Sequence, residues 1–375
     1  MSAHYLSRVF EPESVAVVGA SEKESSVAGQ VVRNLQHAGF KGEIYPVNPK
    51  HDEVLGLTCY HSLADIGHPI DLVMIAVPAP AVPAIMRQCA DVGVHGVVVM
   101  SAGFGEAGPR GRALQDEIVD IARNNNIHMI GPNCLGIIRP RVGLNATFSK
   151  SPASVGRIAL VAQSGAIGTA LLDWADGQGF GFSALASLGG TADIGFGELL
   201  DYLASDPYTK SILLYVEGIS DARSFLSGLR VAARMKPVIV VKSGRNDAGT
   251  KAASSHTGAM IGADDVFDAA IGRAGAVRVN TVNQLFSAAR LLASGARVGG
   301  NRLGIVTNGG GPGVMAADRA ADIDVQLGDL SQATKDKLDQ VLPAHWSHGN
   351  PVDVLGDADA SRYGAAVQAC LEDKG

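Results

Sequence analysis

Short apolar strands alternate with amphipathic helices along this 375-residue chain, a pattern that predicts an α/β fold with doubly wound parallel sheets. The composition agrees, because 46 glycines, 46% hydrophobic residues and only 5% aromatic residues are typical of such units and not of a β-sandwich. Small-residue turns also join a predicted strand to a predicted helix at Gly19, Gly165 and Gly309. A chain of this length is expected to hold two or three domains.

The first region, up to about residue 145, alternates predicted strands with predicted helices. Val27, Val31 and Leu35 recur at helical spacing, and Gly39 supplies a stop after them. Strands are predicted at Ser14–Val18, Glu43–Val47, Leu72–Val77, Gly96–Met100 and His128–Ile130, and further helices at Ala81–Val92 and Arg110–Asn124.

The pattern restarts after a less regular stretch, Pro140–Ser154, and again after a glycine-bearing joint, Ser294–Gly300. The second region has predicted strands at Arg157–Val161, Phe182–Ser187, Ser211–Val216, Pro237–Val241 and Ala276–Val279, with helices at Gly165–Gln178, Glu198–Ala204 and Ser224–Met235. The third has a strand at Arg302–Thr307 and helices at Gly313–Ala321 and Ala360–Glu372. Because no strand follows the last helix, we expect this unit to be incomplete and the chain to be a piece of a longer protein.

Bulk properties exclude several classes of protein. A formal charge of −6 argues against a nucleic-acid binder, so an anionic ligand would be held by local donors. The N-terminus resembles no signal peptide, and no apolar run reaches the roughly 18 residues of a membrane helix. The four cysteines lie far apart, without CxxC or metal-spaced histidine pairs. These features predict reduced thiols, no metal site, no membrane partner and a cytoplasmic location.

His256 is the most informative residue of the chain. It lies in a loop of small residues, SSHTGA, between a predicted strand, Lys236–Ser243, and a predicted helix, Asp264–Gly275. Small neighbours leave the imidazole uncovered and supply hydroxyl and backbone N–H groups, which suits a ring that reaches a phosphoryl group. The alternative is an ordinary loop histidine.

The turn after the first strand predicts a nucleotide-type ligand. Gly19 permits close approach of the backbone to a phosphate, and the following helix start offers free N–H groups. The turn is not GxGxxG, and the second strand runs into Lys50 instead of an acidic residue, which weakens an NAD-dependent oxidoreductase as an interpretation. The alternative is a tight turn without a ligand.

Other strand ends fall on the same predicted edge of the sheet. Val77–Pro80 follows the third strand, Ser101–Glu106 the fourth, and Asn133 the fifth, where ligands bind to open parallel sheets. The prolines stiffen their loop, or merely make a sharp exit from the sheet. Cys134 has no neighbouring base in the sequence, so we interpret it as a packed thiol.

Two glycine-rich helix starts are candidates for one shared anion. Ser164–Gly165 and the run NGGGPG, which begins at Asn308, both follow a predicted strand. Glu217, directly after the strand Ser211–Val216, could orient a histidine ring, or be an exposed loop acid.

In this order the chain resembles the NDP-forming acyl-CoA synthetase superfamily, which includes ADP-forming acetyl-CoA synthetases and, more distantly, succinyl-CoA synthetase. The likeness runs from near Phe10 to the last residue. It rests on VGAS, YPVNPK, VPAP, GPNCLG, QSGAIG, SLGGTADIGFGE, VEGI, SSHTGA and TNGGGPG. Each motif is weak alone, but their ordered combination is specific.

The resemblance implies three domains: a Rossmann-like CoA-binding domain (residues 1–145) and two flavodoxin-like ligase domains (residues 146–296, and 297–375, truncated). It implies that His256 is phosphorylated during turnover and that Glu217 steadies it. Phosphate would be held by Ser164, Gly165, Asn308, Gly309, Gly310 and Gly311. CoA would lie across the strand ends, at Gly19, Ala20, Ser21, Lys50, Val77, Pro78, Ala79, Pro80 and Asn133.

The implied reaction is acyl-CoA + phosphate + ADP ⇌ acid + CoA + ATP. ATP or ADP and Mg²⁺ would bind to an ATP-grasp domain or subunit, which is missing from these residues, and an oligomer is expected. The alternative is the CoA-sensing region of a protein lysine acetyltransferase with a fused acetyltransferase (GNAT) domain. Retention of His256 favours the synthetase.

Overall fold

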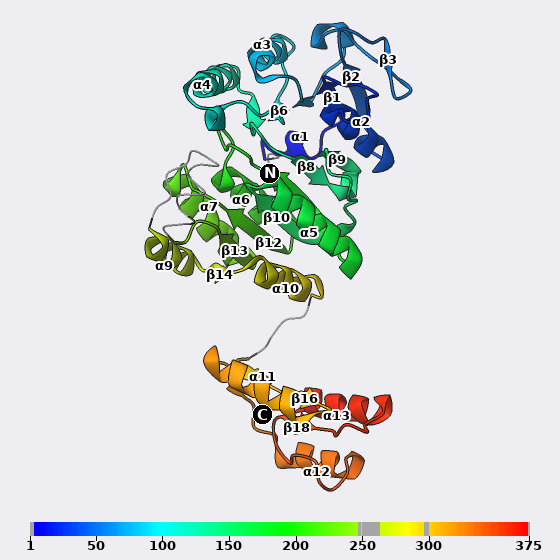
Figure 1. The fold of residues 1–375 in the computed structure, drawn as a ribbon, viewed down its shortest axis with the longest axis vertical. Coiled ribbons are helices and arrows are strands. Elements are labelled where there is room, and N and C mark those ends of the chain that lie inside the picture. Colours follow the sequence, from blue (N-terminus) through cyan, green and yellow to red (C-terminus); the bar gives the residue numbers. More distant parts are fainter. Residues whose placement is uncertain (1–3, 247–248, 250–262, 296–299, 374–375) are drawn as a thin grey trace. The chain divides into compact units, whose positions relative to one another are not determined.

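The computed structural model describes residues 4–246, 249, 263–295 and 300–373, which form two compact units, 1–295 and 296–375. The first unit holds two large sheets, and the second holds two short ones (Figure 1). The predicted α/β class with parallel sheets is confirmed.

The five-stranded sheet of the first unit is entirely parallel. Its order is β2-β1-β5-β6-β7, so the chain leaves β1 in one direction to β2 and in the other to β5. Its strands are β1 (Ser14–Val18), β2 (Glu43–Val47), β5 (Leu72–Ile75), β6 (Gly96–Val99) and β7 (His128–Ile130). A small hairpin, β3 (Glu53–Val54) and β4 (Leu57–Thr58), follows β2.

Alternate side chains of these strands face opposite layers of helices. Val15 and Val17 pack with α1 (Ser7–Phe10) and α2 (Val27–His37), whereas Ala16 and Val18 share a core with α3 (Val82–Asp91) and α4 (Pro109–Asn124). Successive strand residues point to opposite faces of a sheet, so a continuous apolar run makes both faces of the sheet apolar. Each face is therefore covered by helices, which is the doubly wound arrangement.

The seven-stranded sheet has the order β14-β13-β12-β10-β11-β8-β9. The strands are β10 (Val155–Ala162), β11 (Phe182–Ser187), β12 (Ser211–Val216), β13 (Val238–Lys242) and β14 (Val277–Val279), all parallel, with β8 (Gly136–Arg139) and β9 (Leu144–Thr147) added antiparallel. One face packs on α5 (Gly165–Gln178) and α10 (Val282–Ala293), the other on α6 (Phe196–Ser205), α7 (Ala222–Met235) and α9 (Asp264–Ala274).

The hairpin β8–β9 is a structural element that the sequence pattern did not reveal. Its residues fall partly in the stretch that was predicted to be irregular, yet β8 pairs with β11 at Ile138↔Leu185 and extends the second sheet. Gly143 makes the turn at a φ of +70°, a conformation that favours glycine. The predicted domain boundary at residue 145 therefore falls inside β9, and the three-domain division stays a prediction.

The described residues of the second unit form two pairs of short parallel strands and three helices. The pairs are β15 (Arg302–Leu303) with β17 (Gln326–Leu327), and β16 (Val306–Thr307) with β18 (Val352–Asp353); the helices are α11 (Gly310–Asp322), α12 (Gln332–Val341) and α13 (Ala360–Glu372). The single predicted strand Arg302–Thr307 is therefore wrong. The Asn350 amide accounts for the break, since it accepts a hydrogen bond from Ile305 N and donates one to Leu303 O, at 2.9 and 2.6 Å.

Candidate functional site

Three of the predicted CoA-binding segments lie on neighbouring strands. Gly19–Ser21 follows β1, Lys50 follows β2 and Val77–Pro80 follows β5, and these strands are adjacent in the order β2-β1-β5. They meet at the carboxyl edge of the sheet, where its winding direction reverses, which is the place where open α/β sheets bind ligands. The fourth predicted position, Asn133, follows β7 at the far side of the sheet.

The turn after β1 requires glycine. Gly19 has a φ of +93°, and a Cβ atom there would come within 2.6 Å of the Ala76 carbonyl oxygen. Its N–H donates to Val47 O at 2.9 Å, and the Asn48 amide donates to Ala20 O at 2.7 Å. The turn is thus held by two hydrogen bonds against the end of β2, and it packs closely on the residue that follows β5.

The neighbouring loops differ in how much they expose. The Lys50 side chain is exposed, and its backbone N–H donates to the Asn48 side chain at 3.0 Å. Pro78 and Pro80 are exposed, whereas Ala79 is buried and begins the turn that leads into α3. The edge therefore offers a cationic side chain and two rigid exposed rings on either side of Gly19.

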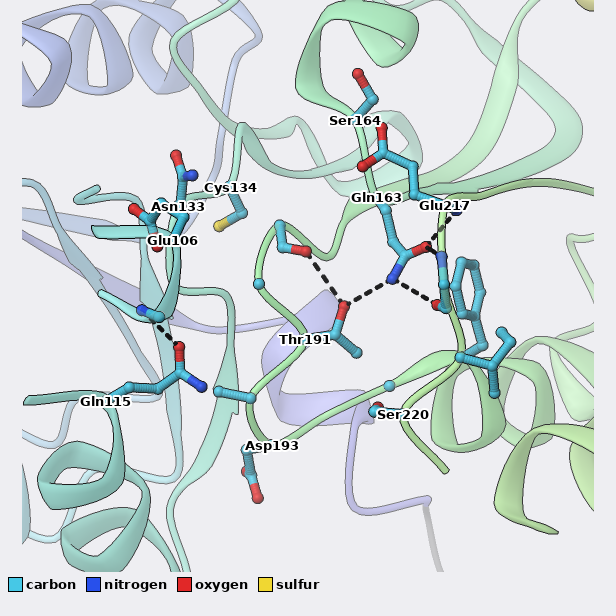
Figure 2. Close-up of a pocket in the computed structure, with 18 of the residues that line it drawn as sticks. Glu106, Gln115, Asn133, Cys134, Gln163, Ser164, Thr191, Asp193, Glu217 and Ser220 are labelled. Atoms are coloured by element: carbon cyan, nitrogen blue, oxygen red, sulfur yellow. Dashed lines mark hydrogen bonds between the residues drawn. The ribbon is translucent and has the colours of Figure 1, made fainter. Parts of the chain in front are cut away.

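A cleft of about 810 Å³ within the first unit brings several of the other predicted residues together. Asn133 and Cys134 line one side, and Ser164 and Glu217 line the other (Figure 2). Gly165, next to Ser164 in the chain, also lines the cleft. The Gly19, Lys50 and Val77 segments are not among its lining residues. Other charged and amide side chains line the cleft too, and none of them was predicted as a site residue: Glu106, Arg112, Gln115, Arg123, Gln163, Asp193, Glu198 and Asp221.

Ser164 begins α5 and caps it. Its hydroxyl accepts the Ile167 N–H at 3.5 Å, while helix geometry leaves the Gly165 and Ala166 N–H groups without a partner inside the helix. This is the positive end of a 14-residue helix, and it lies in the wall of the cleft. An anion is favoured there.

Glu217 is buried, with 8% of its surface exposed. The alternative of an exposed loop acid is therefore wrong. It follows β12 directly, and its backbone N–H donates to the Gln163 side chain at 2.6 Å. Glu217 and Ser164 line the same cavity, and the predicted role of Glu217 in orienting the His256 ring stays a prediction.

Cys134 is a packed thiol, as the sequence predicted. It is buried, its Sγ lies 3.4 Å from Val99 O, and burial raises its pKa to about 12. The four cysteines Cys59, Cys89, Cys134 and Cys370 are all free.

Cys134 is therefore expected to resist alkylation by iodoacetamide at pH 8 in the folded protein. With a pKa near 12, roughly one thiol in ten thousand is ionised at that pH, and only the thiolate reacts. Mass spectrometry of tryptic peptides should find this cysteine unmodified before, and fully modified after, unfolding in urea. Rapid labelling of the folded protein would show that the thiol is activated.

In the second unit, the glycine run forms the start of α11. Gly309 is the extended residue before the helix, its N–H donates to Thr307 Oγ1 at 3.2 Å, and Asn308 is exposed. The sequence placed this helix start at Gly313, but it begins at Gly310. The predicted meeting of this segment with Ser164 at one phosphate stays a prediction.

His256 lies outside the described residues, but the elements on either side of it are well defined. Lys242, the last residue of β13, pairs with Asp264, the first residue of α9, at 3.3 Å. Arg278 on β14 binds both carboxylate oxygens of Asp264 at 2.7 Å. The ends of the segment 243–263 are therefore held together by a largely buried ion network.

The described residues hold neither a metal-binding cluster nor a membrane-spanning helix. No group of three or more His, Cys, Asp or Glu side chains there could hold a metal ion. Within the same ranges, no helix has the length and apolarity needed to cross a bilayer.

Family models match most of the chain in the order of its elements. Residues 13–140 match a CoA binding domain, residues 155–292 a succinyl-CoA ligase like flavodoxin domain, and residues 303–375 a ligase-CoA domain.

Two curated relatives and one solved structure are similar over 98% of the chain. Acetate–CoA ligase [ADP-forming] I of Archaeoglobus fulgidus is 43% identical, with 53% of its own length matched, so the chain spans about half of that protein. Acetate–CoA ligase [ADP-forming] I subunit alpha of Pyrococcus furiosus is 38% identical, with 80% matched. A dinucleotide-forming acetyl-coenzyme A synthetase 1 of Candidatus Korarchaeum cryptofilum, solved with phosphate and ADP, has 35% identity and a TM-score of 0.94, with 80% of its chain matched. The likeness predicted from the sequence motifs is thereby confirmed, and the chain belongs to the family of ADP-forming acyl-CoA synthetases.

Proposed function

We propose that this chain is the CoA-ligase part of an ADP-forming acyl-CoA synthetase that acts on a short-chain acyl group. The observation that carries the proposal is the cleft in which the anion-favouring start of α5, the buried Glu217 and the Asn133 loop of the CoA-binding region come together. The same proposal divides the chain into a CoA-binding domain (residues 1–145) and two ligase domains (residues 146–296 and 297–375).

The proposed reaction has three group transfers. A phosphate oxygen attacks the thioester carbonyl carbon, the C–S bond breaks, and CoA leaves as a thiolate that takes up a proton. A neutral imidazole nitrogen of His256 then attacks phosphorus in the acyl phosphate, and the P–O bond to the acyl group breaks to release the carboxylate. Phosphohistidine finally passes the phosphoryl group to ADP.

The residues of the cleft contribute by position and charge. N–H groups at the start of α5, at Gly165 and Ala166, would bind the phosphate oxygens, and Asn308–Gly311 in the second unit would bind them from another helix start. Glu217 would accept a hydrogen bond from one imidazole N–H of His256, which leaves the other nitrogen free to attack. Most of the rate would come from such positioning and electrostatic stabilisation.

Nucleotide and Mg²⁺ would bind to an ATP-grasp partner, in the same polypeptide or in a second subunit. The Pyrococcus furiosus relative is named as an alpha subunit, which favours the second of these arrangements. We also propose that the protein is an oligomer. The relatives named above are ligases, which favours a synthetase over the regulatory region of a lysine acetyltransferase.

A labelling experiment tests this function. We expect acetyl-CoA and ³²P-labelled phosphate to leave acid-labile, base-stable label on the chain, with one CoA thiol released for each phosphoryl group bound. Thiol release is followed with a chromogenic disulfide and the label by gel autoradiography. A chain that neither releases CoA nor takes up label would refute the proposed function.

A separate measurement tests the CoA site. Lys50→Ala is expected to weaken CoA binding about three- to tenfold in calorimetry, because one charge-assisted contact from an exposed lysine is worth about 1 kcal/mol. Lys41→Ala is the matched control, since Lys41 is also exposed but precedes β2 instead of following it. Equal losses in both variants, or equal affinity for NAD and CoA, would argue against this site.

A further inference from the structure

The Gln163 side chain joins the backbone at Glu217 to the loop of residues 189–193. Its Oε1 accepts the N–H groups of Glu217 and Gly218 at 2.6 and 3.0 Å, and its Nε2 donates to Gly218 O at 2.9 Å and to Thr191 Oγ1 at 3.4 Å (Figure 2). A primary amide has two N–H donors and one oxygen with two lone pairs. The full capacity of this amide is therefore engaged, and three of its four bonds hold the residues Glu217 and Gly218.

Gln163 occupies a special place in the second sheet. It follows β10, and its own N–H donates to Tyr215 O on the adjacent strand β12 at 3.2 Å. The ladder between these strands ends at Ala162↔Tyr215, so the next backbone groups on the β12 side need other partners. The Gln163 side chain supplies them. The next residue in the chain is Ser164, which caps the start of α5. Gln163 therefore fixes the position of Glu217 relative to this helix start.

Thr191, the fourth partner, has a strained backbone. Its φ is +51°, which for a β-branched residue costs on the order of 1–3 kcal/mol. Its neighbours Gly190 and Ala192 donate to Pro132 O and Gly131 O at 2.7 and 3.0 Å. The loop is thereby bonded to the residues that directly precede Asn133, and Gln163 connects the two sides of the cleft.

We propose that Gln163 is a positioning residue for Glu217, an inference that rests on the proposed function. Its amide holds the Glu217–Gly218 peptide against the start of α5, so the Glu217 carboxylate keeps one position relative to the phosphate. A shift of about 1 Å in such a group is enough to cost a hundredfold in rate. Gln163 itself acts through Glu217 and not on the phosphoryl group.

A double-mutant cycle on the rate of phosphate labelling, measured with acetyl-CoA and ³²P-labelled phosphate, tests this role. Gln163→Ala is expected to slow labelling roughly 10- to 100-fold in the otherwise unaltered chain, as the loss of two or three buried hydrogen bonds implies. In the Glu217→Gln background the same change should cost less than about threefold, because the carboxylate that it positions is already gone. CoA affinity should stay unchanged throughout.

Gln115→Ala is the matched control. Gln115 lines the same cleft, but its Oε1 accepts the Gly105 N–H at 3.1 Å, on the side of the cleft opposite Glu217 (Figure 2). The loss in labelling rate caused by Gln115→Ala, whatever its size, should be equal in the unaltered chain and in the Glu217→Gln background. If the cost of Gln163→Ala is also equal in both, Gln163 does not act through Glu217 and the inference is wrong.

Two further outcomes are distinguishable. If Gln163→Ala does not fold, Thr191→Val takes its place in the cycle, since it removes the Oγ1 partner of the Gln163 amide together with the bond from that Oγ1 to Gly189 O. A two- to fivefold loss of labelling rate is expected in the chain with Glu217 and none in the Glu217→Gln background. Equal losses in both backgrounds would overturn the inference. If the unaltered chain itself takes up no label, the proposed function fails, and the role of Glu217 fails with it.

Discussion

The His256→Ala variant is expected to take up no phosphate label at all, against full labelling of the unaltered chain. In the proposed reaction the imidazole nitrogen forms the only covalent bond between protein and phosphorus, so no partial activity remains once the ring is gone. The label is measured after incubation with acetyl-CoA and ³²P-labelled phosphate, with an acid-lability test to identify phosphohistidine. This prediction rests on the SSHTGA motif and on the family, because His256 lies outside the described residues.

His68→Ala provides the matched control. His68 is exposed and precedes β5, at the amino edge of the first sheet and away from the ligand edge. This variant should label like the unaltered chain, and both variants should bind CoA equally, since CoA is assigned to a different region. Persistent label on His256→Ala would show that another residue accepts the phosphoryl group, and the mechanism would have to be abandoned.

Arg139→Met is expected to destabilise the first unit by about 3–5 kcal/mol, the usual cost of removing one partner from a buried ion pair. The Arg139 and Asp206 side chains are 1% and 3% exposed, and they form two parallel bonds, Nη1 to Oδ2 at 2.8 Å and Nη2 to Oδ1 at 2.9 Å. Arg139 also donates to Glu11 and to Ser183 O. The change would leave the Asp206 carboxylate buried without its cation.

The destabilisation should depend on pH. Burial alone would raise the pKa of Asp206, but the hydrogen bonds from Arg139 and Thr209 outweigh it and hold that pKa below its ordinary value. Because the pKa of Asp206 is lower in the folded state, the pair stabilises the fold fully when the pH is above the pKa of an unfolded Asp, about 3.9. This stabilisation is lost as the pH falls through the pKa of Asp206 in the folded state. In Arg139→Met, protonation of Asp206 removes the buried charge. The loss in free energy of unfolding, relative to the unaltered chain, should therefore shrink towards pH 3.

Urea unfolding at pH 7 and pH 3.5 measures both effects. Arg87→Met is the control, because Arg87 pairs with Glu117 on the surface, where both side chains are largely exposed, and its loss should cost under about 1 kcal/mol at either pH. Equal shifts of the urea midpoint in the two variants would mean that the buried pair contributes no more than a surface pair.

Hydrophobic periodicity was sufficient to predict most elements of the fold. The strands at Ser14–Val18, Glu43–Val47 and Ser211–Val216 were predicted to the residue, because each is a short, mostly apolar run between turn residues. The α5 helix was equally clear, since Ser164 caps it and Gly179 follows it in the left-handed conformation. Glycine motifs also led to the prediction of which strand ends bind ligands, since backbone approach to an anion limits the choice of residue, and this part stays a prediction.

Partners distant in the chain were decided only by tertiary structure. The hairpin β8–β9 has no pattern of its own that shows it will pair with β11, and the strand at Arg302–Thr307 breaks because an asparagine 45 residues away binds its backbone. Glu217 is recognisable as polar and loop-borne, but not as buried. Gln163 carries no sequence mark of its hydrogen bonds to residues 28 and 54 positions away. Local patterns determine which face of an element is apolar, whereas the neighbours of a side chain depend on how packed elements close around it.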